Sequence, residues 1–436
     1  MLENLKRNKW LFIIVIVLIA IVLAFYFLYQ SPNLQPETTY YYRTYNQYSN
    51  NQKNNDIILG SNNNFISKVV FDKNYGGAGF DTTPVVSGDV IYVGTMNKSN
   101  MGGGLYAISR LNHKVLWSDS FSNWIMTNPV VVPEQGLVYI GSGNSVKYGV
   151  QSKGVLYRGT GPNYVYGIAL DTGKVVWRYS TLGQDMPTPI YNKGVLYFVN
   201  GNREFYALNA TSGKLIWKIY VGSIVSMSSP ILIGNNVYFG GADPYKFFDV
   251  NIKTRKIQWE TSFPKITGGL DDTTPAYYKG YLYTNATMLT NKSQNKGNEY
   301  LYKINASNGT IVWSLNEGNG VINLPTDPME GSVPTIQGNV IYTGSNTRRM
   351  IFAVNIDTHK ILWTYKIHGM INAPFVIIKN LVYAVTGDGN IYVLSKKDGE
   401  FIAKRTLGGP EIASGLSFYS GEFYVTTGNG NLYILD

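Results

Sequence analysis

Residues 169–177 read Ala-Leu-Asp-Thr-Gly-Lys-Val-Val-Trp, and this segment decides the fold because copies of it recur along the chain. Each copy consists of an apolar strand end, a polar turn and a second strand that reaches a tryptophan. The copies end at Trp117, Trp177, Trp217, Trp259, Trp313 and Trp363. A seventh copy, residues 391–403, has Ala403 in place of the tryptophan. Self-similarity of this kind is typical of repeat architectures.

A second segment precedes each copy. In it a proline opens an apolar strand, and a further strand containing a tyrosine follows about eight residues later, as in a β-meander. The prolines are Pro84, Pro129, Pro189, Pro230, Pro275, Pro334 and Pro374. The matching tyrosines are Tyr92, Tyr139, Tyr197, Tyr238, Tyr283, Tyr342 and Tyr383. Each repeat therefore predicts four short antiparallel strands.

The last repeat is split between the two ends of the domain. Residues 416–419, 423–427 and 432–435 supply three strands, and residues 66–71 resemble the missing tryptophan-bearing strand. Seven full units and a split eighth predict an all-β fold, an eight-bladed β-propeller over residues 57–436 that closes by pairing its N- and C-terminal strands. We expect the repeated tryptophans to dock between neighbouring blades, where each buries roughly 150–250 Å².

The repeat carried by Ala169–Trp177 and its copies resembles the tryptophan-docking repeat of the pyrroloquinoline quinone (PQQ) alcohol dehydrogenase-like propeller superfamily. The resemblance covers nearly all of residues 57–436. This superfamily contains calcium- and PQQ-dependent dehydrogenases, and also non-enzymatic propellers such as the lipoprotein of the bacterial outer-membrane assembly machine. The resemblance therefore implies the fold and leaves the activity open.

The sequence departs from the dehydrogenase pattern at a central point. The chain has no cysteine, so the adjacent cysteine pair that covers the quinone in those enzymes cannot form, and the chain is shorter than they are. No catalytic residue is carried over from the family. We expect no cofactor, and PQQ with Ca²⁺ is the alternative that the resemblance keeps open.

Composition excludes several other chemistries. The absence of cysteine excludes disulfides, cysteine-ligated zinc, iron-sulfur clusters and thiol nucleophiles. Only 15% of the 436 residues are charged, and the net charge of +10 is spread without long Lys/Arg runs. Nucleic acid is therefore not an expected partner.

Residues 10–29 form an uncharged, apolar run that is long enough to cross a hydrocarbon core of about 30 Å. Lys6, Arg7 and Lys9 precede it, so the positive-inside rule places residues 1–9 in the cytoplasm as a short tail. We expect one transmembrane helix that anchors an extracytoplasmic propeller in the cell membrane as a single-pass protein. A cleaved signal peptide is the competing interpretation, although the bulky residues 25–29 are unlike a cleavage site.

Residues 30–56 are polar and rich in Tyr and Asn, which is typical of a flexible linker. Sequons of the N-x-S/T type fit an exported glycoprotein. The candidate glycosylation sites are Asn97, Asn209, Asn285, Asn291, Asn305 and Asn308.

Insertions mark one face of the predicted ring. If the strands of a blade are lettered A to D from the centre outward, the B–C loops and the D–A loops between blades emerge on the same face. The long B–C loops (residues 142–163 and 285–299) and a long D–A loop (residues 316–332) all lie there. Elaborated loops on a rigid scaffold favour a single working surface.

The D–A loops concentrate carboxylates and methionines. The carboxylates are Asp81, Asp185, Asp271, Asp272, Asp327 and Glu330, and the methionines are Met126, Met186, Met227, Met329 and Met370. Asp271 and Asp272 are candidate Ca²⁺ ligands, and the thioethers of Met126, Met186, Met227 and Met370 are candidate ligands of a soft ion. Alternatively, the acids cap turns and the methionines fill the channel mouth. Trp124 either stacks on a planar ligand or packs its own loop.

These features favour a membrane-anchored propeller that acts as a protein-interaction or ligand-binding scaffold in the cell envelope. Its expected partners are other envelope or surface proteins, or glycans. The enzymatic alternative is a membrane-bound dehydrogenase that uses PQQ and Ca²⁺, or an accessory subunit of a membrane electron-transfer complex.

Overall fold

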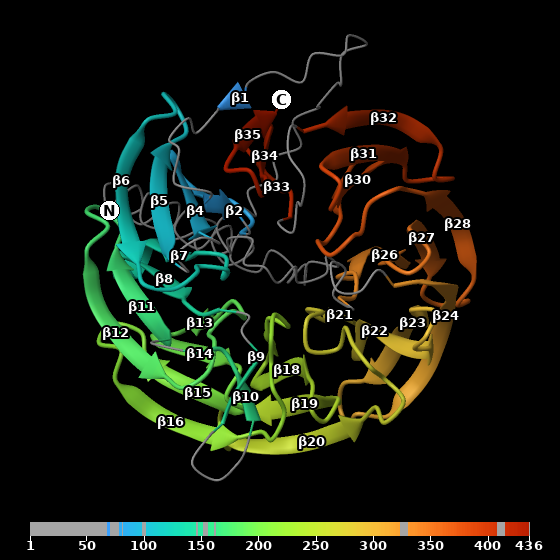
Figure 1. The fold of residues 1–436 in the computed structure, drawn as a ribbon, viewed down its shortest axis with the longest axis horizontal. Coiled ribbons are helices and arrows are strands. Elements are labelled where there is room, and N and C mark those ends of the chain that lie inside the picture. Colours follow the sequence, from blue (N-terminus) through green and yellow to red (C-terminus); the bar gives the residue numbers. More distant parts are fainter. Residues whose placement is uncertain are drawn as a thin grey trace, which may run out of the picture. The chain divides into compact units, whose positions relative to one another are not determined.

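The structure is a computed structural model, and it describes residues 68–69, 78–80, 82–97, 102–144, 147–150, 156–160, 163–322, 330–407 and 415–435. All of these belong to one compact unit, residues 40–436. They form nine sheets: eight are arranged as blades around a ring (Figure 1), and the ninth is a separate two-stranded hairpin. The predicted all-β, eight-bladed propeller is confirmed.

Each blade is an antiparallel meander whose first strand lies nearest the centre and whose last strand lies at the rim (Figure 1). Blade 1 contains β2 (Ala78–Phe80), β3 (Val85–Ser87), β4 (Val90–Asn97), β5 (Gly103–Ser109) and β6 (Val115–Phe121). Blade 2 contains β7 (Val130–Val132), the short 3₁₀ helix η1 (Pro133–Gln135), β8 (Leu137–Gly141), β11 (Asn163–Ala169) and β12 (Val175–Thr181). Blade 3 contains β13 (Ile190–Asn192), β14 (Val195–Val199), β15 (Glu204–Asn209) and β16 (Leu215–Tyr220).

The next three blades follow the same order. Blade 4 contains β17 (Ile231–Ile233), β18 (Asn236–Gly241), β19 (Lys246–Asn251) and β20 (Lys256–Ser262). Blade 5 contains β21 (Ala276–Tyr278), β22 (Tyr281–Asn291), β23 (Lys296–Asn305) and β24 (Ile311–Val321). Blade 6 contains β25 (Thr335–Gln337), β26 (Val340–Ser345), β27 (Met350–Asn355) and β28 (Ile361–Lys366).

The last two blades complete the ring. Blade 7 contains β29 (Val376–Ile378), β30 (Leu381–Thr386), β31 (Asn390–Ser395) and β32 (Phe401–Thr406). Blade 8 combines β33 (Ser417–Tyr419), β34 (Glu422–Thr426) and β35 (Leu432–Leu435) with β1 (Lys68–Val69). In it Lys68 pairs with Tyr433 and Val69 with Leu432, so the predicted closure by the N- and C-terminal strands is confirmed.

Four of the outer-strand tryptophans dock on the next blade in the same way. The indole N–H of an outer-strand tryptophan donates to a backbone carbonyl beside the C–D turn of the next blade, at 2.8–3.0 Å. The pairs are Trp117 with Leu170, Trp177 with Ala210, Trp259 with Ala306 and Trp363 with Lys396. Each of these four rings also covers a turn glycine: Gly173, Gly213, Gly309 and Gly399, respectively. In blade 6 the turn residue is His359, and Trp313 stacks on its ring at 4.4 Å.

A second set of contacts joins the D–A loops next to the prolines. The side chain of the residue before Pro129, Pro189, Pro230 and Pro275 accepts the backbone N–H of the equivalent residue in the preceding blade. Thr83 donates to Asn128 at 2.8 Å, Asn128 to Thr188 at 3.2 Å, Thr188 to Ser229 at 3.0 Å and Ser229 to Thr274 at 3.2 Å. These bonds fix the inner loops of blades 1 to 5 relative to one another.

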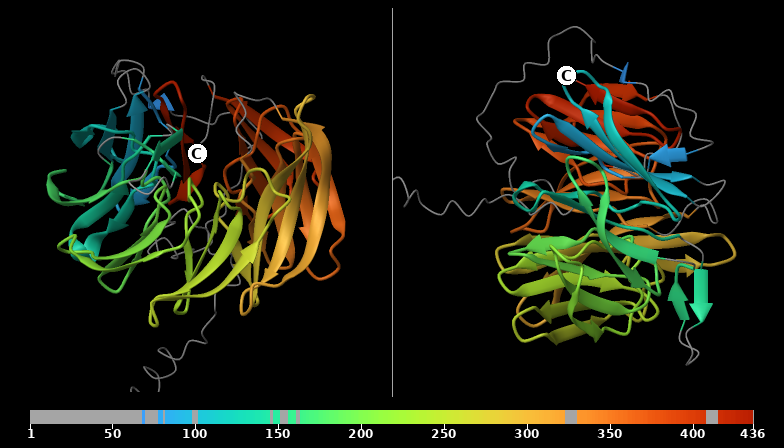
Figure 2. Two further views of the ribbon diagram at one scale, coloured as in Figure 1. Left: turned by 60° about the horizontal axis from the view of Figure 1, so that its bottom comes forward. Right: turned by 90° about the vertical axis from the view of Figure 1, so that its left-hand side faces the viewer.

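The insertions differ from the expected loops. Residues 285–299 do not form a long loop, because β22 and β23 continue as a hairpin with only residues 292–295 between them. Strand β24 likewise runs on to Val321, so that all three strands pair along their length. Residues 142–163 contain a separate hairpin, β9 (Lys147–Val150) and β10 (Leu156–Arg158), which stands out from one face of the ring (Figure 2).

Within the described residues, no helix is long and apolar enough to cross a membrane. The predicted tail, anchor and linker (residues 1–56) lie outside those residues, and the anchor stays a prediction. Asp81, Asp327 and Met329 also lie outside them.

Docking on the turn glycine has a direct test. A Cβ added at Gly213 would lie 2.4 Å from the Trp177 ring, whereas a Cβ at Gly234 would meet nothing within 4 Å. The φ angles of these glycines are nearly equal, +67° and +62°, so the backbone strain of an alanine is matched. We expect Gly213→Ala to lower the free energy of unfolding by about 1–3 kcal/mol more than Gly234→Ala does, because overpacking typically costs that much. Denaturant unfolding measures both. Equal losses would contradict the docking contact.

Candidate functional site

The β9–β10 hairpin lies against the loops of blade 3. Arg158, at the end of β10, donates its backbone N–H to the carbonyl of Gly201 at 2.9 Å and accepts from the N–H of Gln184 at 2.8 Å. Gly201 in turn donates to the carbonyl of Gln184 at 2.9 Å. A Cβ at Gly201 would lie 2.3 Å from the Arg158 carbonyl oxygen, so glycine is required for this close approach. The hairpin is therefore held rigidly beside the D–A loop that leads into β13.

Arg203 fastens the same hairpin from the other side. Its buried guanidinium donates to the backbone carbonyls of Leu156 at 2.7 Å and Gly222 at 2.8 Å, and also to that of Asp243. One side chain thus bridges the hairpin, the D–A loop of blade 4 and the B–C turn of blade 4. Such a planar, multi-donor group suits this bridging role.

Asp271 lies at the junction of blades 4 and 5. Its backbone carbonyl accepts the N–H groups of Ser226, Met227 and Ser228 at 3.2, 3.0 and 2.7 Å, which fixes its position against the neighbouring D–A loop. Its side chain is 7% exposed. Burial raises the pKa of Asp271 well above its usual range, the adjacent Asp272 raises it further, and Arg158 lowers it. The result is a buried carboxyl group whose protonated form is favoured and which lies within electrostatic reach of a guanidinium.

Asp185 is a second buried acid on these loops, but its oxygens are fully engaged. Thr181 donates to Oδ2 at 2.5 Å and Asn200 donates to Oδ1 at 3.0 Å. Burial raises the pKa of Asp185 to about 7, and these two hydrogen bonds oppose the shift. With both oxygens occupied, Asp185 is better suited to positioning its loop than to exchanging protons with a ligand.

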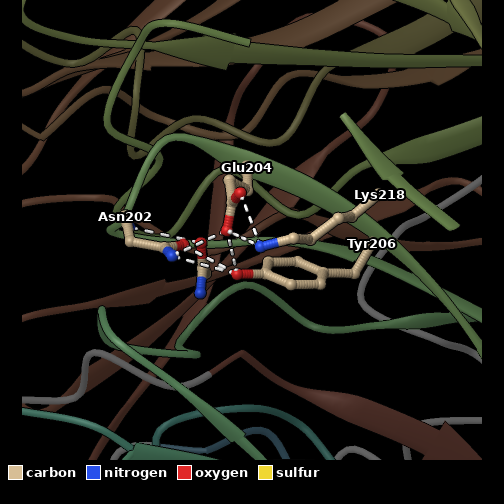
Figure 3. Close-up of polar contacts among 5 residues, drawn as sticks. Asn202, Glu204, Tyr206 and Lys218 are labelled. Carbon is tan, nitrogen blue, oxygen red and sulfur yellow. Dashed lines mark hydrogen bonds and ion pairs between the residues drawn. The ribbon is translucent and has the colours of Figure 1, made fainter. Parts of the chain in front are cut away.

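A polar network continues from Asn200 to the outer strand of blade 3 (Figure 3). The amide oxygen of Asn200 accepts the backbone N–H of Asn202 at 3.2 Å. Asn202 donates to Glu204 at 3.0 Å and to the Tyr206 hydroxyl at 2.9 Å, and Lys218 forms an ion pair with Glu204 at 2.8 Å. This network stiffens the B–C turn that supports Asp185.

Of the other predicted rim residues, Met227 joins this cluster through its backbone N–H, which donates to the Asp271 carbonyl, whereas Glu330 and Trp124 have their partners elsewhere. Glu330 lies at the D–A loop of blade 6, where Asn372 donates to its carboxylate. The four candidate methionines, Met126, Met186, Met227 and Met370, sit on the D–A loops of blades 2, 3, 4 and 7. The Trp124 indole donates to the carbonyl of Asn97, at the end of β4, at 3.0 Å.

The residues present fit a PQQ and Ca²⁺ site poorly. Among the described residues, no three His, Asp or Glu side chains come together in a group that could hold a metal ion. Within the described residues no third acidic or histidine side chain joins Asp271 and Asp272, and Arg158 lies within electrostatic reach of Asp271. We derive no chemistry through PQQ or its metal.

One candidate glycosylation site is inaccessible. Asn285 is fully buried, and its amide nitrogen donates to Ser332 and Thr343, so a glycan cannot be attached to it in the folded protein. The strand pairing of β22 places Asn285 between two blades, and glycosylation of Asn285 stays a prediction that this burial disfavours. The remaining sequon asparagines, Asn97, Asn209, Asn291, Asn305 and Asn308, are exposed or half-buried, and their glycosylation stays a prediction.

Sequence reasoning singled out Asp271, Asp272 and Asp185 but missed Arg158 and Arg203. Both arginines belong to parts of the fold without a repeat signal: a hairpin inside an insertion, and a B–C turn. The nearest sequence signal is Gly201, because a glycine next to a turn often marks close backbone contact.

Two curated proteins are similar to the chain. The tetrathionate hydrolase of Acidithiobacillus ferrooxidans is 28% identical over 323 residues, which cover 70% of this chain and 63% of that protein. The tetrathionate hydrolase of Acidianus ambivalens is 27% identical over 365 residues, 75% of this chain and 66% of that protein. The chain thus spans just under two thirds of the length of each relative.

Solved structures show the same architecture. BamB from Moraxella catarrhalis superposes with a TM-score of 0.62 at 15% identity, covering 86% of this chain and 99% of that one. The quinohemoprotein alcohol dehydrogenase from Comamonas testosteroni superposes with a TM-score of 0.54 at 13% identity, covering 82% of this chain and 74% of that one. These likenesses concern the fold alone.

The family model described as outer membrane protein assembly factor BamB matches residues 138–284 and 297–436. These ranges hold the repeats of blades 3 to 8 and most of blade 2. The chain therefore belongs to this family of PQQ-like β-propellers.

Proposed function

We propose that the propeller hydrolyses tetrathionate, or a closely related polythionate, on the face that carries the D–A loops. The observation that carries this proposal is the similarity to two curated tetrathionate hydrolases over most of the chain. The electrostatics around Asp271 support it, because this buried acid lies within electrostatic reach of the Arg158 guanidinium.

Tetrathionate is a dianion with a sulfonate group at each end. Its hydrolysis adds water across a bond to sulfur, so a site must hold the sulfonate oxygens and give a proton to the departing sulfur. Ionised carboxylates nearby would repel the substrate. A site for this reaction therefore needs guanidinium or ammonium groups, and acids that stay neutral.

Arg158 and Asp271 meet these needs. The half-buried guanidinium of Arg158 presents several N–H donors in one plane, which suits the oxygens of a sulfonate. Burial and Asp272 raise the pKa of the Asp271 carboxyl, which favours the neutral form that would not repel the dianion and could act as the general acid. In this assignment Asp185, Asn200 and Arg203 position the loops around them.

A scaffold function is the second candidate, because the matching family model describes an assembly factor. The projecting β9–β10 hairpin and the extended β22–β23 hairpin would then form the contact surface for another envelope protein. Quantitative crosslinking in native membranes, with wild-type protein and a variant shortened in residues 291–296, tests this candidate. Unchanged crosslinks would exclude the β22–β23 hairpin as the contact.

We also propose that residues 10–29 anchor the protein in the cell membrane with the propeller on the outer side. The uncharged run and the preceding Lys6, Arg7 and Lys9 support this arrangement.

Replacing the Asp271 carboxyl group with an amide should strongly slow turnover. We expect Asp271→Asn to lower kcat/KM for tetrathionate by about 10²–10⁴-fold, the usual contribution of a general acid. The measurement is tetrathionate consumption followed by ion chromatography. Asp249→Asn is the matched control, because Asp249 is also a buried acid whose pKa is raised to about 7, but it lies within β19. Full activity of Asp271→Asn would refute the role of Asp271, and an inactive wild-type protein would refute the hydrolase proposal.

The pH profile should report the protonated form of Asp271. Because its folded pKa is raised, we expect kcat/KM to be high in acid and to fall only as the pH rises through that pKa. Arg158 lowers this pKa, so Arg158→Gln should move the falling limb to higher pH while raising KM. If the falling limb does not move, Arg158 does not influence the titration of the general acid.

Deleting residues 1–29 should release the protein from membranes. Because the deletion removes the predicted apolar span, we expect the propeller to move to the soluble fraction, as judged by fractionation and immunoblotting. N-terminal sequencing of the full-length protein from membranes distinguishes an anchor, which keeps residues 10–29, from a cleaved signal peptide.

A further inference from the structure

Four buried acceptor oxygens without a hydrogen-bond donor occur in side chains of blade 5 that face blade 6. They are Asn285 Oδ1, Glu299 Oε1 and both carboxyl oxygens of Glu317. All three side chains are at most 1% exposed, so water does not reach them as it does a surface carboxylate. A buried polar atom without a partner costs free energy, and several together call for a common explanation.

Strand pairing places the three residues on one face of the blade. Thr287 on β22 lies opposite Glu299 on β23, and Asn285 is two residues from Thr287, so it points to the same side. Glu299 lies opposite Gly318 on β24 and Tyr300 lies opposite Asn316, which makes Glu317 the extra residue of a β-bulge. Bulges redirect a side chain, and here the bulge brings a second carboxyl toward the first.

Contacts from blade 6 surround the same spot. Asn346 and Thr347 donate their backbone N–H groups to Glu299 Oε2 at 2.6 and 3.3 Å. The amide nitrogen of Asn285 donates to the Thr343 hydroxyl at 2.6 Å and to the Ser332 carbonyl at 2.9 Å. Since both of its amide hydrogens are used, the orientation of Asn285 is fixed and its Oδ1 points away from these two partners.

The two carboxyl groups are close enough to influence each other. Glu317 lies within electrostatic reach of Glu299, and both side chains are buried. The Arg348 guanidinium donates to the backbone carbonyl of Glu317 at 3.2 Å, and it donates to none of the three unpartnered carboxyl oxygens. Two carboxylates in such a place cannot both be ionised unless a cation lies between them.

We propose that Asn285, Glu299 and Glu317 bind a hard divalent cation, of which Ca²⁺ is the best fit. Carboxylate and amide oxygens are the ligands that Ca²⁺ prefers, and one ion would satisfy all four free acceptors. The site is separate from Asp271 and does not depend on the proposed hydrolase function. It lies among strands β22, β23 and β24.

The bound cation would join two blades. Glu299 already accepts a backbone N–H from the B–C turn of blade 6. The Asn285 amide donates to the carbonyl of Ser332, in the loop that leads into β25, and accepts no hydrogen bond itself. A cation on their remaining oxygens would fix this loop and the turn to the long hairpin of blade 5. With two carboxylates in the site, we expect a dissociation constant of about 10⁻⁴–10⁻³ M, as in extracellular calcium modules.

Binding is tested on the full chain, stripped of metal with EDTA and dialysed at pH 7.5. Isothermal titration calorimetry with CaCl₂ should show one site, and the thermal unfolding midpoint should rise saturably with Ca²⁺. Glu317→Gln should remove the binding while leaving the protein folded, since the uncharged amide needs no counterion. Asp249→Asn, a buried acid in blade 4, should bind as wild type does and serves as the matched control.

Two outcomes would overturn the proposal. If CaCl₂ changes neither heat nor unfolding midpoint, and the metal-free protein instead gains stability as the pH falls, the carboxyl pair holds protons and no cation. If Glu317→Gln binds Ca²⁺ as wild type does, the ion binds elsewhere. None of these measurements uses tetrathionate. A failure to bind Ca²⁺ therefore does not affect the hydrolase proposal, and a failure to hydrolyse tetrathionate does not affect the Ca²⁺ proposal.

Discussion

The ring depends on the contact between an outer-strand tryptophan and the C–D turn of the next blade. The indole supplies a large apolar face and one N–H, and the turn supplies a carbonyl and a residue that leaves room for the ring. Where the turn lacks glycine, the contact changes form, as in the stack of Trp313 on His359. Between blades 7 and 8, where Ala403 replaces the tryptophan, Tyr383 packs on Phe423 with ring centroids 4.6 Å apart.

The sequence was sufficient to predict what repeats. The blade number, the split eighth blade and the docking tryptophans follow from recurring apolar and turn residues, since each blade must bury the same faces. The continuation of β22 and β23 through residues 285–299 was not predictable in this way. That segment is rich in Asn and lacks apolar alternation. It is extended because β23 pairs on both sides, with β22 and with β24.

The candidate site was predictable in part for the same reason. Asp185 and Asp271 stand next to the recurrent prolines, so their loops could be placed on one face from the repeat alone. Their protonation depends on burial by neighbouring blades, and the location of Arg158 depends on a hairpin whose attachment is set by Arg203 and Gly201. These are tertiary contacts between unrelated segments, and local sequence patterns carry no information about them. The propeller thus provides a rigid scaffold, and its insertions supply residues that the repeat does not.

The closure of blade 8 also constrains how the chain acquires its structure. Lys68 and Val69 pair with residues hundreds of positions later, Tyr433 and Leu432, so the loop that this pairing closes contains nearly the whole ring. Closing so long a loop carries a large entropic cost until the intervening blades have stacked and brought the two strands together. The seam in blade 8 is therefore a late event in folding, and until it forms, strand β35 presents an unpaired edge to other chains. A chain released before its C-terminal strands are complete would keep blade 8 open at that edge.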